Sequence, residues 1–285
     1  VILLVAWFFF GCAASPRSLS IDDFASDGYY ESLPPLGKKG YFIKQLAPEV
    51  YFFSTGAYNN IFVVTSEGVV ITDPIKGKGK LLKRAISEVT SQPVSFMVYS
   101  HSHIDHIGDA YLFAGNGVQI VAQVETGKAL KRYRDKNRPL PHINFGTNYS
   151  LSIGGINIEL IYMGEGHGKG NSIIYIPSRK IMMYVDLVTP KSVPFKNFAY
   201  TIDIVSQIKG IEKALKLDFD IYVAGHLNRP GTREEMQEVL AYYYASRKAS
   251  IKAIKRVSFV DVRKKSKTKD IEHLFGEYLD TVAEE

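Results

Sequence analysis

The segment V-S-F-M-V-Y-S-H-S-H-I-D-H, residues 94–106, joins an apolar run to a cluster of side chains that can bind metal. Residues 94–99 predict a buried strand. Four potential ligands follow: His101, His103, Asp105 and His106. In extended backbone, residues two positions apart point to the same side, so His101 and His103 can bind one cation. The adjacent residues Asp105 and His106 point differently and suit a second cation. The segment therefore predicts a metal site at the end of a strand.

The amino-acid composition narrows the kind of metal site. The chain has 285 residues, 46% hydrophobic and 22% charged, which is typical of a globular protein and excludes general disorder. Its single cysteine, Cys12, excludes an internal disulfide and a site built from several thiolates. Imidazole nitrogen and carboxylate oxygen without sulfur suit zinc, while iron and manganese remain open.

The sequence H-S-H-I-D-H resembles the H-x-H-x-D-H signature of the metallo-β-lactamase superfamily. Four further segments resemble the other motifs of that family and follow in the same order. They are V-V-I-T-D-P with Asp73, G-E-G-H-G-K-G-N with His167, I-M-M-Y-V-D with Asp186, and I-Y-V-A-G-H with His226. The resemblance extends from Tyr41 to Arg233. One such motif alone would be weak evidence for the family, whereas the full set in the family's order is specific evidence.

The resemblance implies an α/β fold, a four-layer αβ/βα sandwich with the metal site at the rim of its two sheets. Hydrophobic patterns predict strands at residues 50–53, 61–65, 69–72, 94–99, 119–122, 150–153, 156–162, 172–176, 181–185 and 221–224. They predict helices at residues 79–90, 124–134, 202–215, 233–256 and 270–282. No linker rich in Gly, Pro or Ser interrupts these elements. We therefore expect one domain over residues 41–285 that ends in C-terminal helices.

The ligand arrangement of the family, transferred residue by residue, implies two metal ions. Three imidazoles would bind the first ion: His101, His103 and His167. Three further side chains would bind the second ion: Asp105, His106 and His226. Asp186 would bridge the two ions, and Asp73 would brace the loop that carries the ligands. Gly168 stands where the family usually has Ser or Thr, so other groups must orient His167.

This ligand set implies a hydrolase. Two cations can lower the pKa of a bridging water toward about 7, which makes hydroxide available to attack an acyl carbon. The resemblance thus predicts an exported zinc-dependent hydrolase that cleaves an ester, lactone, thioester or amide bond with a metal-bridging hydroxide. Asp105 would orient the hydroxide and carry the proton to the leaving group. The expected partner is a small-molecule substrate.

Three alternatives remain open. Zinc β-lactamases of the superfamily generally have Cys or no ligand where this chain has Asp186, but an exported location keeps a β-lactam substrate open. Sulfur dioxygenases of the superfamily use one iron at positions equivalent to His101, His167 and Asp186. A metal-binding lipoprotein without enzymatic activity is the alternative from a different class.

Four further polar residues are candidates for a role at the site. His142 lies in the proline-marked segment R-P-L-P-H-I-N-F, where it could contact substrate or serve as an ordinary surface or packing residue. Tyr200 precedes the predicted helix at residues 202–215 and could donate a hydrogen bond to a developing oxyanion. Asn171 and Ser172 follow His167 closely and could brace that loop or contact substrate, and we expect them to brace it.

The N-terminal segment predicts export. The first ten residues, VILLVAWFFF, are apolar and precede Gly11 and Cys12. Spanning a bilayer takes about 20 residues, so this run is too short for a transmembrane helix but suits an export signal. Its end resembles a bacterial lipoprotein signal, in which the cysteine is lipidated. We therefore predict an export signal over residues 1–15, lipidation of Cys12, and a periplasmic or membrane-anchored protein.

Positive charge gathers near the C-terminus. Residues 245–270 contain ten Lys or Arg and two Asp, in a chain of formal net charge +6. Some superfamily members are nucleases, but this stretch follows the last ligand and is poor in aromatic residues, so we do not expect a nucleic-acid partner. A solvated helix face is the first interpretation, and attraction to an anionic membrane surface is the second. The oligomeric state remains open.

Overall fold

The computed structural model describes residues 35–194 and 196–256. The chain divides into two units, Val1–Pro35 and Leu36–Glu285, and all described residues except Pro35 belong to the second. The predicted export signal with Cys12 and the predicted helix at residues 270–282 lie outside the described residues. The domain limits, the lipidation and the export therefore stay predictions.

Seven strands form the first sheet and pair in the order of the sequence. They are β1 (Phe42–Ala47), β2 (Val50–Ser54), β3 (Asn59–Thr65), β4 (Gly68–Thr72), β5 (Val94–Val98), β6 (Gln119–Gln123) and β7 (Ile143–Phe145). β1 to β4 pair antiparallel, and β4 to β7 pair in parallel. Parallel pairing requires crossover connections, which the helices between β4 and β7 provide.

Six strands form the second sheet, in the order β13-β12-β11-β10-β9-β8. They are β8 (Asn148–Ile153), β9 (Ile156–Tyr162), β10 (Ser172–Ile176), β11 (Ile181–Met183), β12 (Ile221–Val223) and β13 (Gly231–Thr232). β11 and β12 pair in parallel, and the other neighbours pair antiparallel. The crossover between β11 and β12 contains α5 (Lys196–Tyr200) and α6 (Ile204–Ala214).

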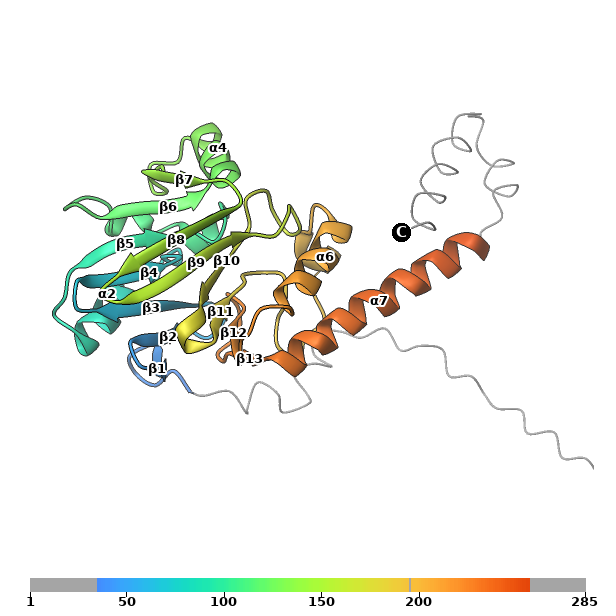
Figure 1. Ribbon diagram of the computed structural model, residues 1–285, viewed down its shortest axis with the longest axis horizontal. Helices are drawn as coiled ribbons and strands as arrows, with labels where there is room; N and C mark the ends of the chain where they lie inside the picture. The colour runs from blue at the N-terminus through green and yellow to red at the C-terminus, as the bar shows by residue number, and fades with distance from the viewer. Residues whose placement is uncertain (1–34, 195, 257–285) are drawn as a thin grey trace, which may run out of the picture. The chain divides into compact units, whose positions relative to one another are not determined.

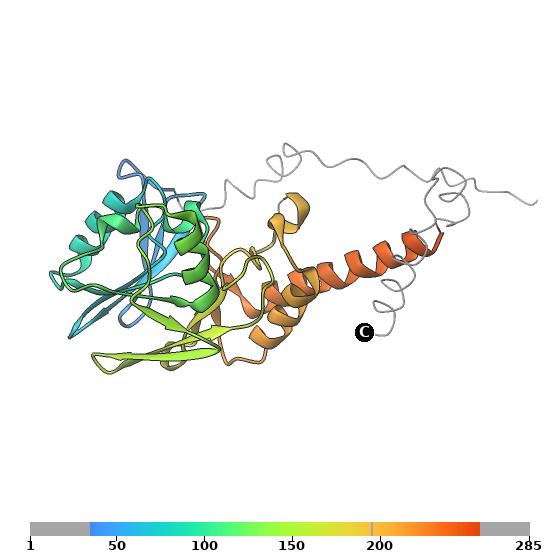
Figure 2. The ribbon, with the colours of Figure 1, turned by 90° about the horizontal axis from the view of Figure 1, so that it is seen from above.

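The two sheets pack face to face, with helices on their outer sides (Figures 1 and 2). Successive residues of β4 show why both faces of a sheet are buried. Val70 packs with Ile174 of the second sheet, whereas Val69 and Ile71 pack on the opposite face with Leu82 of a covering helix. Side chains alternate between the faces of a strand, so a continuous apolar run fits a sheet that is covered on both sides.

Helices cover the outer face of each sheet. α2 (Gly79–Val89) and α4 (Val124–Tyr133) cover the first sheet, and α6 and α7 (Arg233–Arg256) cover the second. The layers are thus helix, sheet, sheet and helix, which confirms the predicted four-layer sandwich. Within residues 35–194 and 196–256, no helix is both long and apolar enough to cross a membrane.

Several element ends differ from the prediction. The helix predicted from residue 202 begins at Ile204, because the Asp203 side chain accepts a hydrogen bond from Ser206 N and caps the helix there. The short strands β1, β7 and β13 were not predicted. The same holds for α3 (Ile104–Ile107), for α5, and for two 3-10 turns, η1 (Ala110–Leu112) and η2 (Pro177–Arg179). Each is too short, or too mixed in polarity, to show a clear period.

The ends of the strands bring the predicted ligands to one rim. Ser172 N at the start of β10 donates a hydrogen bond of 2.9 Å to Ser100 O after β5, which joins the two sheets there. Asp73 follows β4 and Asp186 follows β11, with φ angles of 36° and 66°. This left-handed conformation is strained for a residue other than glycine. The surrounding structure therefore holds both carboxylates in place at the rim.

Candidate metal centre

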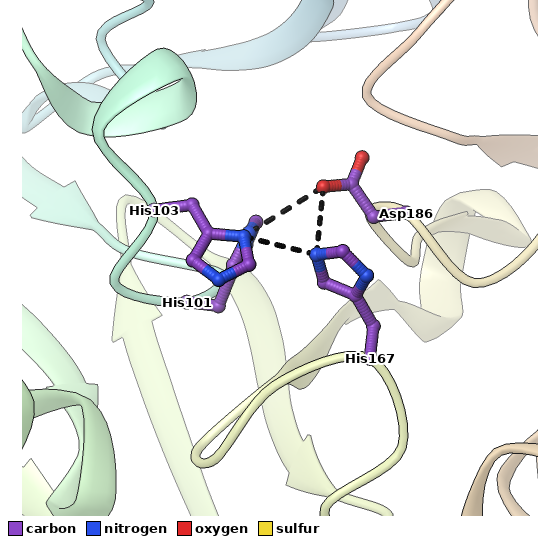
Figure 3. A group of neighbouring side chains, drawn as sticks. All are labelled: His101, His103, His167 and Asp186. Carbon is purple, nitrogen blue, oxygen red and sulfur yellow. Dashed lines mark hydrogen bonds and ion pairs between the residues drawn. The ribbon is translucent and has the colours of Figure 1, made fainter. Parts of the chain in front are cut away.

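Seven side chains at the rim form two groups, and within each group the ligand atoms lie within 4.8 Å of one another. The first ligand group is His101, His103, His167 and Asp186. The second ligand group is Asp105, His106 and His226. Figure 3 shows that the side chains of the first ligand group point toward one another. The structure thus brings together all seven residues that the resemblance implies as ligands.

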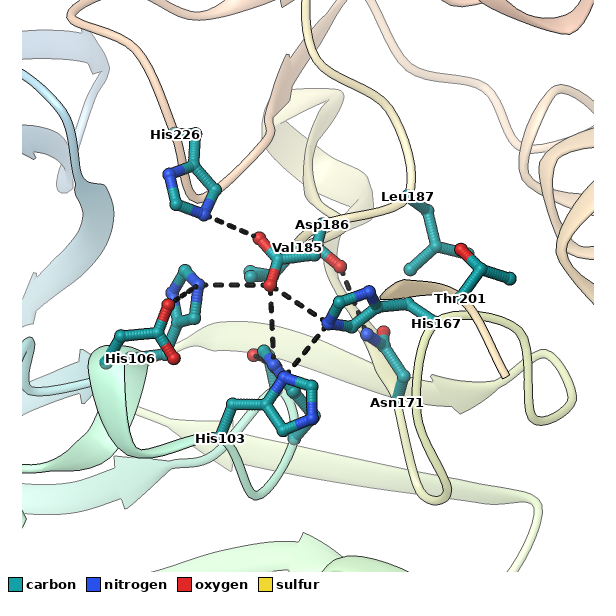
Figure 4. Close-up of polar contacts among 12 residues, drawn as sticks. His103, His106, His167, Asn171, Val185, Asp186, Leu187, Thr201 and His226 are labelled. Atoms are coloured by element: carbon teal, nitrogen blue, oxygen red, sulfur yellow. Dashed lines mark hydrogen bonds and ion pairs between the residues drawn. The ribbon is translucent and has the colours of Figure 1, made fainter. Parts of the chain in front are cut away.

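Asp186 lies between the two groups. Its Oδ2 is 3.5 Å from Nε2 of His101, 3.2 Å from Nε2 of His167 and 3.1 Å from Nε2 of His106. Its Oδ1 is 3.0 Å from Nε2 of His226. Figure 4 shows the carboxylate facing imidazoles of both groups. One carboxylate is therefore positioned to serve two adjacent cations.

A chain of hydrogen bonds through Ser100 to Asp73 holds the His101 ring at Nδ1, the nitrogen that does not face Asp186. Ser100 Oγ lies 2.9 Å from Nδ1 of His101 and donates its own proton to the Asp73 carboxylate. Asp73 is fully buried and also accepts from the Ser100 backbone N at 2.8 Å. Because the serine proton goes to Asp73, the serine oxygen accepts the Nδ1 proton of His101. Nε2 of His101 is then available to bind a metal ion, so Asp73 makes the bracing contact that we expected.

His167 lies in the loop between β9 and β10, where Gly168 offers no hydroxyl. Asn171 N donates to Gly168 O at 3.1 Å, and Asn171 Nδ2 donates to Val185 O at 3.1 Å. Nε2 of His167 then lies 3.0 Å from Nδ1 of His103. Asn171 and the loop backbone thus provide the orientation that a hydroxyl at position 168 would otherwise support.

The second ligand group is more exposed and contacts the turn between β2 and β3. The side chains of Asp105 and His226 are 39% and 33% exposed, compared with 1% for His101. Nδ1 of His226 lies 3.1 Å from Ala57 O and donates to it, which leaves Nε2 available for a metal. Asn59 Nδ2 donates to His226 O at 2.6 Å. The β2–β3 turn therefore orients His226.

Burial and neighbouring charges set the protonation states. Burial lowers the pKa of His101 well below its ordinary value and also lowers the pKa of His103. Burial opposes ionisation of Asp186, but the imidazoles around it, His106 first, hold the pKa of this carboxyl well below its usual range. Burial lowers the pKa of His106 too, yet the charge of Asp186 outweighs this and raises the pKa to about 9. A cation at this site would therefore compete with a proton for His106.

The donor atoms fit divalent metal ions. Among the described residues, Nε2 of His101 and Nε2 of His106 are buried without a hydrogen bond and face an oxygen of Asp186. Leaving a buried polar atom unpaired costs about 1–3 kcal/mol. A cation between these atoms would satisfy them, and imidazole nitrogen with carboxylate oxygen is a donor set that zinc accepts. The cluster is thus a metal-binding site by its chemistry as well as by its geometry.

The two residues predicted as candidates for substrate contact lie outside the ligand groups. His142 is exposed, and its Nδ1 accepts a hydrogen bond of 3.0 Å from Ile120 N in β6. This position favours the packing role that we considered. Tyr200 ends α5 with 58% of its surface exposed. Substrate contact by either residue stays a prediction.

Sequence reasoning missed Tyr58, which lies in the β2–β3 turn. Its ring centroid is 4.6 Å from that of His226 and 5.5 Å from that of His106. Burial, followed by the charge of Asp105, raises the pKa of its hydroxyl. The turn contains none of the ligand motifs. The one feature of the sequence that could have indicated Tyr58 is that the turn follows a predicted strand, because loops at strand ends reach the rim in this fold.

The comparisons with known proteins agree with this geometry. Residues 54–226 match the family model described as the metallo-beta-lactamase superfamily. The chain is 32% identical over 193 residues to the 2,4-dinitroanisole O-demethylase subunit alpha of Nocardioides sp. (strain JS1661). That match covers 65% of this chain but only 57% of the relative. A type 2 metallo-beta-lactamase of Elizabethkingia meningoseptica is 25% identical over 198 residues, which cover 65% of this chain and 78% of the relative.

Solved structures show the same fold. A metallo-beta-lactamase from Pontibacter korlensis superposes with a TM-score of 0.65 at 22% identity, covering 72% of this chain and 99% of that chain. The matched family region begins in β2 and ends at His226, so it contains both ligand groups. The chain therefore belongs to the metallo-β-lactamase superfamily of metal-dependent hydrolases.

Proposed function

We propose that the protein binds two zinc ions and hydrolyses an ester, lactone, thioester or amide bond of a small molecule. The position of Asp186 carries this proposal. Its two carboxylate oxygens face imidazoles of both ligand groups at 3.0–3.5 Å. A carboxylate shared in this way can hold two cations close together, as hydrolytic two-metal sites require. The absence of sulfur from both groups is compatible with zinc.

The residues of the site would have different roles in such a reaction. Zinc supplies a Lewis acid that polarises a substrate carbonyl and lowers the pKa of water toward neutrality. Asp105 is the partly exposed carboxylate of the site, so it can accept a hydrogen bond from the attacking water and take its proton. It can then return that proton to the leaving alkoxide, thiolate or amine. Asp73 and Ser100 keep His101 in the tautomer that presents Nε2.

The test combines metal analysis with turnover of a substrate panel. We expect close to two zinc ions per chain and hydrolysis of at least one chromogenic ester, lactone or thioester. Preference for a β-lactam would instead support the β-lactamase alternative. One iron ion without zinc would overturn the proposal and support the dioxygenase alternative. Two zinc ions without any turnover would support the non-enzymatic metal-binding protein.

Cleavage of an activated aryl methyl ether is a second candidate reaction. Its support is the 32% identity to a protein named a 2,4-dinitroanisole O-demethylase subunit. Water would add across the carbon–oxygen bond, and the products would be a phenol and methanol. Adding 2,4-dinitroanisole to the panel tests this candidate, because release of the coloured phenol would be visible directly.

We also propose export and attachment to a membrane through lipidated Cys12. The support is the apolar run that precedes this cysteine. A single acyl chain binds membranes only marginally, whereas multiple acylation anchors firmly. We expect the protein to sediment with membranes and a Cys12→Ser variant to be released. Equal membrane binding of the variant would contradict the anchor.

A further inference from the structure

One aromatic side chain contacts every member of the second ligand group. The ring of Tyr58 lies edge-on to His106 and tilted against His226, with centroid distances of 5.5 Å and 4.6 Å. Its hydroxyl faces the Asp105 carboxylate. Burial, followed by the neighbouring charge of Asp105, raises the pKa of this hydroxyl. Tyr58 thus lies against three ligands that α3 and the segment after β12 supply.

The backbone around Tyr58 is fixed on both sides. Within the turn, Tyr58 O accepts a hydrogen bond of 2.9 Å from Thr55 N. Across the rim, Tyr58 forms an antiparallel bridge with His226, and Asn59 N donates to Gly225 O at 2.9 Å. These bonds tie the turn to the loop that carries His226. The tyrosine ring therefore has a defined position from which to orient its neighbours.

Asp105 is the member of the second ligand group whose position depends most on such support. Its side chain is 39% exposed, and its ion-pair partner, His106 Nε2, lies 3.6 Å away. An exposed carboxylate in a weak ion pair can rotate, which disperses the positions of its oxygens. A hydrogen bond from a phenol fixes one oxygen and leaves the other for a metal ion or a proton, and outer partners of this kind typically change metal affinity 10- to 100-fold.

We propose that Tyr58 is a positioning residue that assembles the second ligand group. Its hydroxyl orients Asp105, and its ring confines His106 and His226. This inference rests on the proposed two-metal function, because it concerns the binding of the second ion.

Three variants test this role through Zn²⁺ titration against a competing chelator, together with kcat and KM. Tyr58→Phe keeps the ring and removes the hydroxyl, and Tyr58→Ala removes both. Tyr51→Phe is the matched control, because Tyr51 lies in the same hairpin but stacks on Phe62 at 5.1 Å. Thermal unfolding of the metal-free proteins checks that each variant folds.

We expect Tyr58→Phe to weaken the second Zn²⁺ ion about 10-fold or more while the affinity of the first stays unchanged. The kcat should fall with little change in KM, since the loss concerns Asp105 rather than substrate binding. Tyr58→Ala should weaken the second ion further, and Tyr51→Phe should match the wild type.

Two zinc ions in the wild type with unchanged affinities in Tyr58→Phe would overturn the role of Tyr58 and leave the proposed function intact. A single ion in the wild type would overturn both. Equal weakening of both ions in Tyr58→Phe would also overturn the inference.

Discussion

The two ligand groups share one rim but differ in how the protein holds them. Three of the four members of the first ligand group are buried, and His101 is braced by the buried pair Ser100 and Asp73. The second ligand group has two partly exposed members, and its support comes from a surface turn. Buried, hydrogen-bonded ligands are preorganised, whereas exposed ligands lose more freedom when a metal binds. We therefore expect the first group to bind its ion more tightly and the second group to face the substrate.

The largest effect should come from Asp186, the residue that both groups share. Asp186→Ala should fold, because the side chain lies at the rim, but it should lose at least about 100-fold in rate, and both ions should bind more weakly. Steady-state kinetics and metal analysis measure this. Asp218→Ala is the control, since its exposed ion pair with Lys180 contributes little. Full activity with both ions retained in Asp186→Ala would show that the groups are independent.

Removing one imidazole from each group tests the difference between them directly. His226→Ala should release one ion and keep the other, so that the metal content falls from about two toward one. His101→Ala should weaken the tighter site and also destabilise the apo protein, because it empties a buried position. Elemental analysis after dialysis and thermal unfolding distinguish these outcomes. The opposite pattern, with His226→Ala losing the tighter ion, would reverse the proposed order of affinities.

The bracing of the first group predicts a smaller effect. Asp73→Asn keeps the size of the side chain but replaces one acceptor of the Ser100 hydrogen bonds by a donor. We expect the metal affinity of the first group to fall about 10- to 100-fold. Asp109→Asn is the matched control, because Asp109 also accepts a backbone N–H at 2.8 Å, from Gly79, but contacts no ligand there. A chelator titration compares the two. Equal affinities in Asp73→Asn and the wild type would rule out the bracing role.

The smallest expected effect concerns the backbone beside the second group. Gly225 has φ +85°, and a Cβ there would lie 2.5 Å from Val185 Cγ1 and 3.0 Å from His106 Cε1. Gly225→Ala should destabilise the fold by more than about 1 kcal/mol and displace His106. Gly77→Ala is the control. Gly77 has φ +72°, and no atom lies within 4 Å of a Cβ built there, so this variant measures the backbone strain alone. Denaturant unfolding should show the larger loss for Gly225→Ala, and equal losses would mean that His106 has room to adjust.

The sequence by itself determined the family, the layers and the identity of the ligand residues. Apolar runs such as residues 69–72 and 94–99 reveal strands, because the period of side-chain burial is a local property of the chain. The order of the motifs then implied the fold, which the structure confirms. The hydrophobic pattern locates helix ends less precisely than strands, since a single capping residue such as Asp203 determines where the helix begins.

Only the tertiary structure decided how the ligands divide into two groups of different exposure. The position of Asp186 between four imidazoles depends on the pairing of β11 with β12 and on a left-handed backbone angle. The role of the β2–β3 turn depends on the bond from Asn59 N to Gly225 O, between residues far apart in the sequence. His142 is of the same residue type as the ligand histidines, but it precedes β7 and accepts a hydrogen bond from Ile120 N. Such contacts join distant segments, and no local period records them, because they form only when the two sheets pack together.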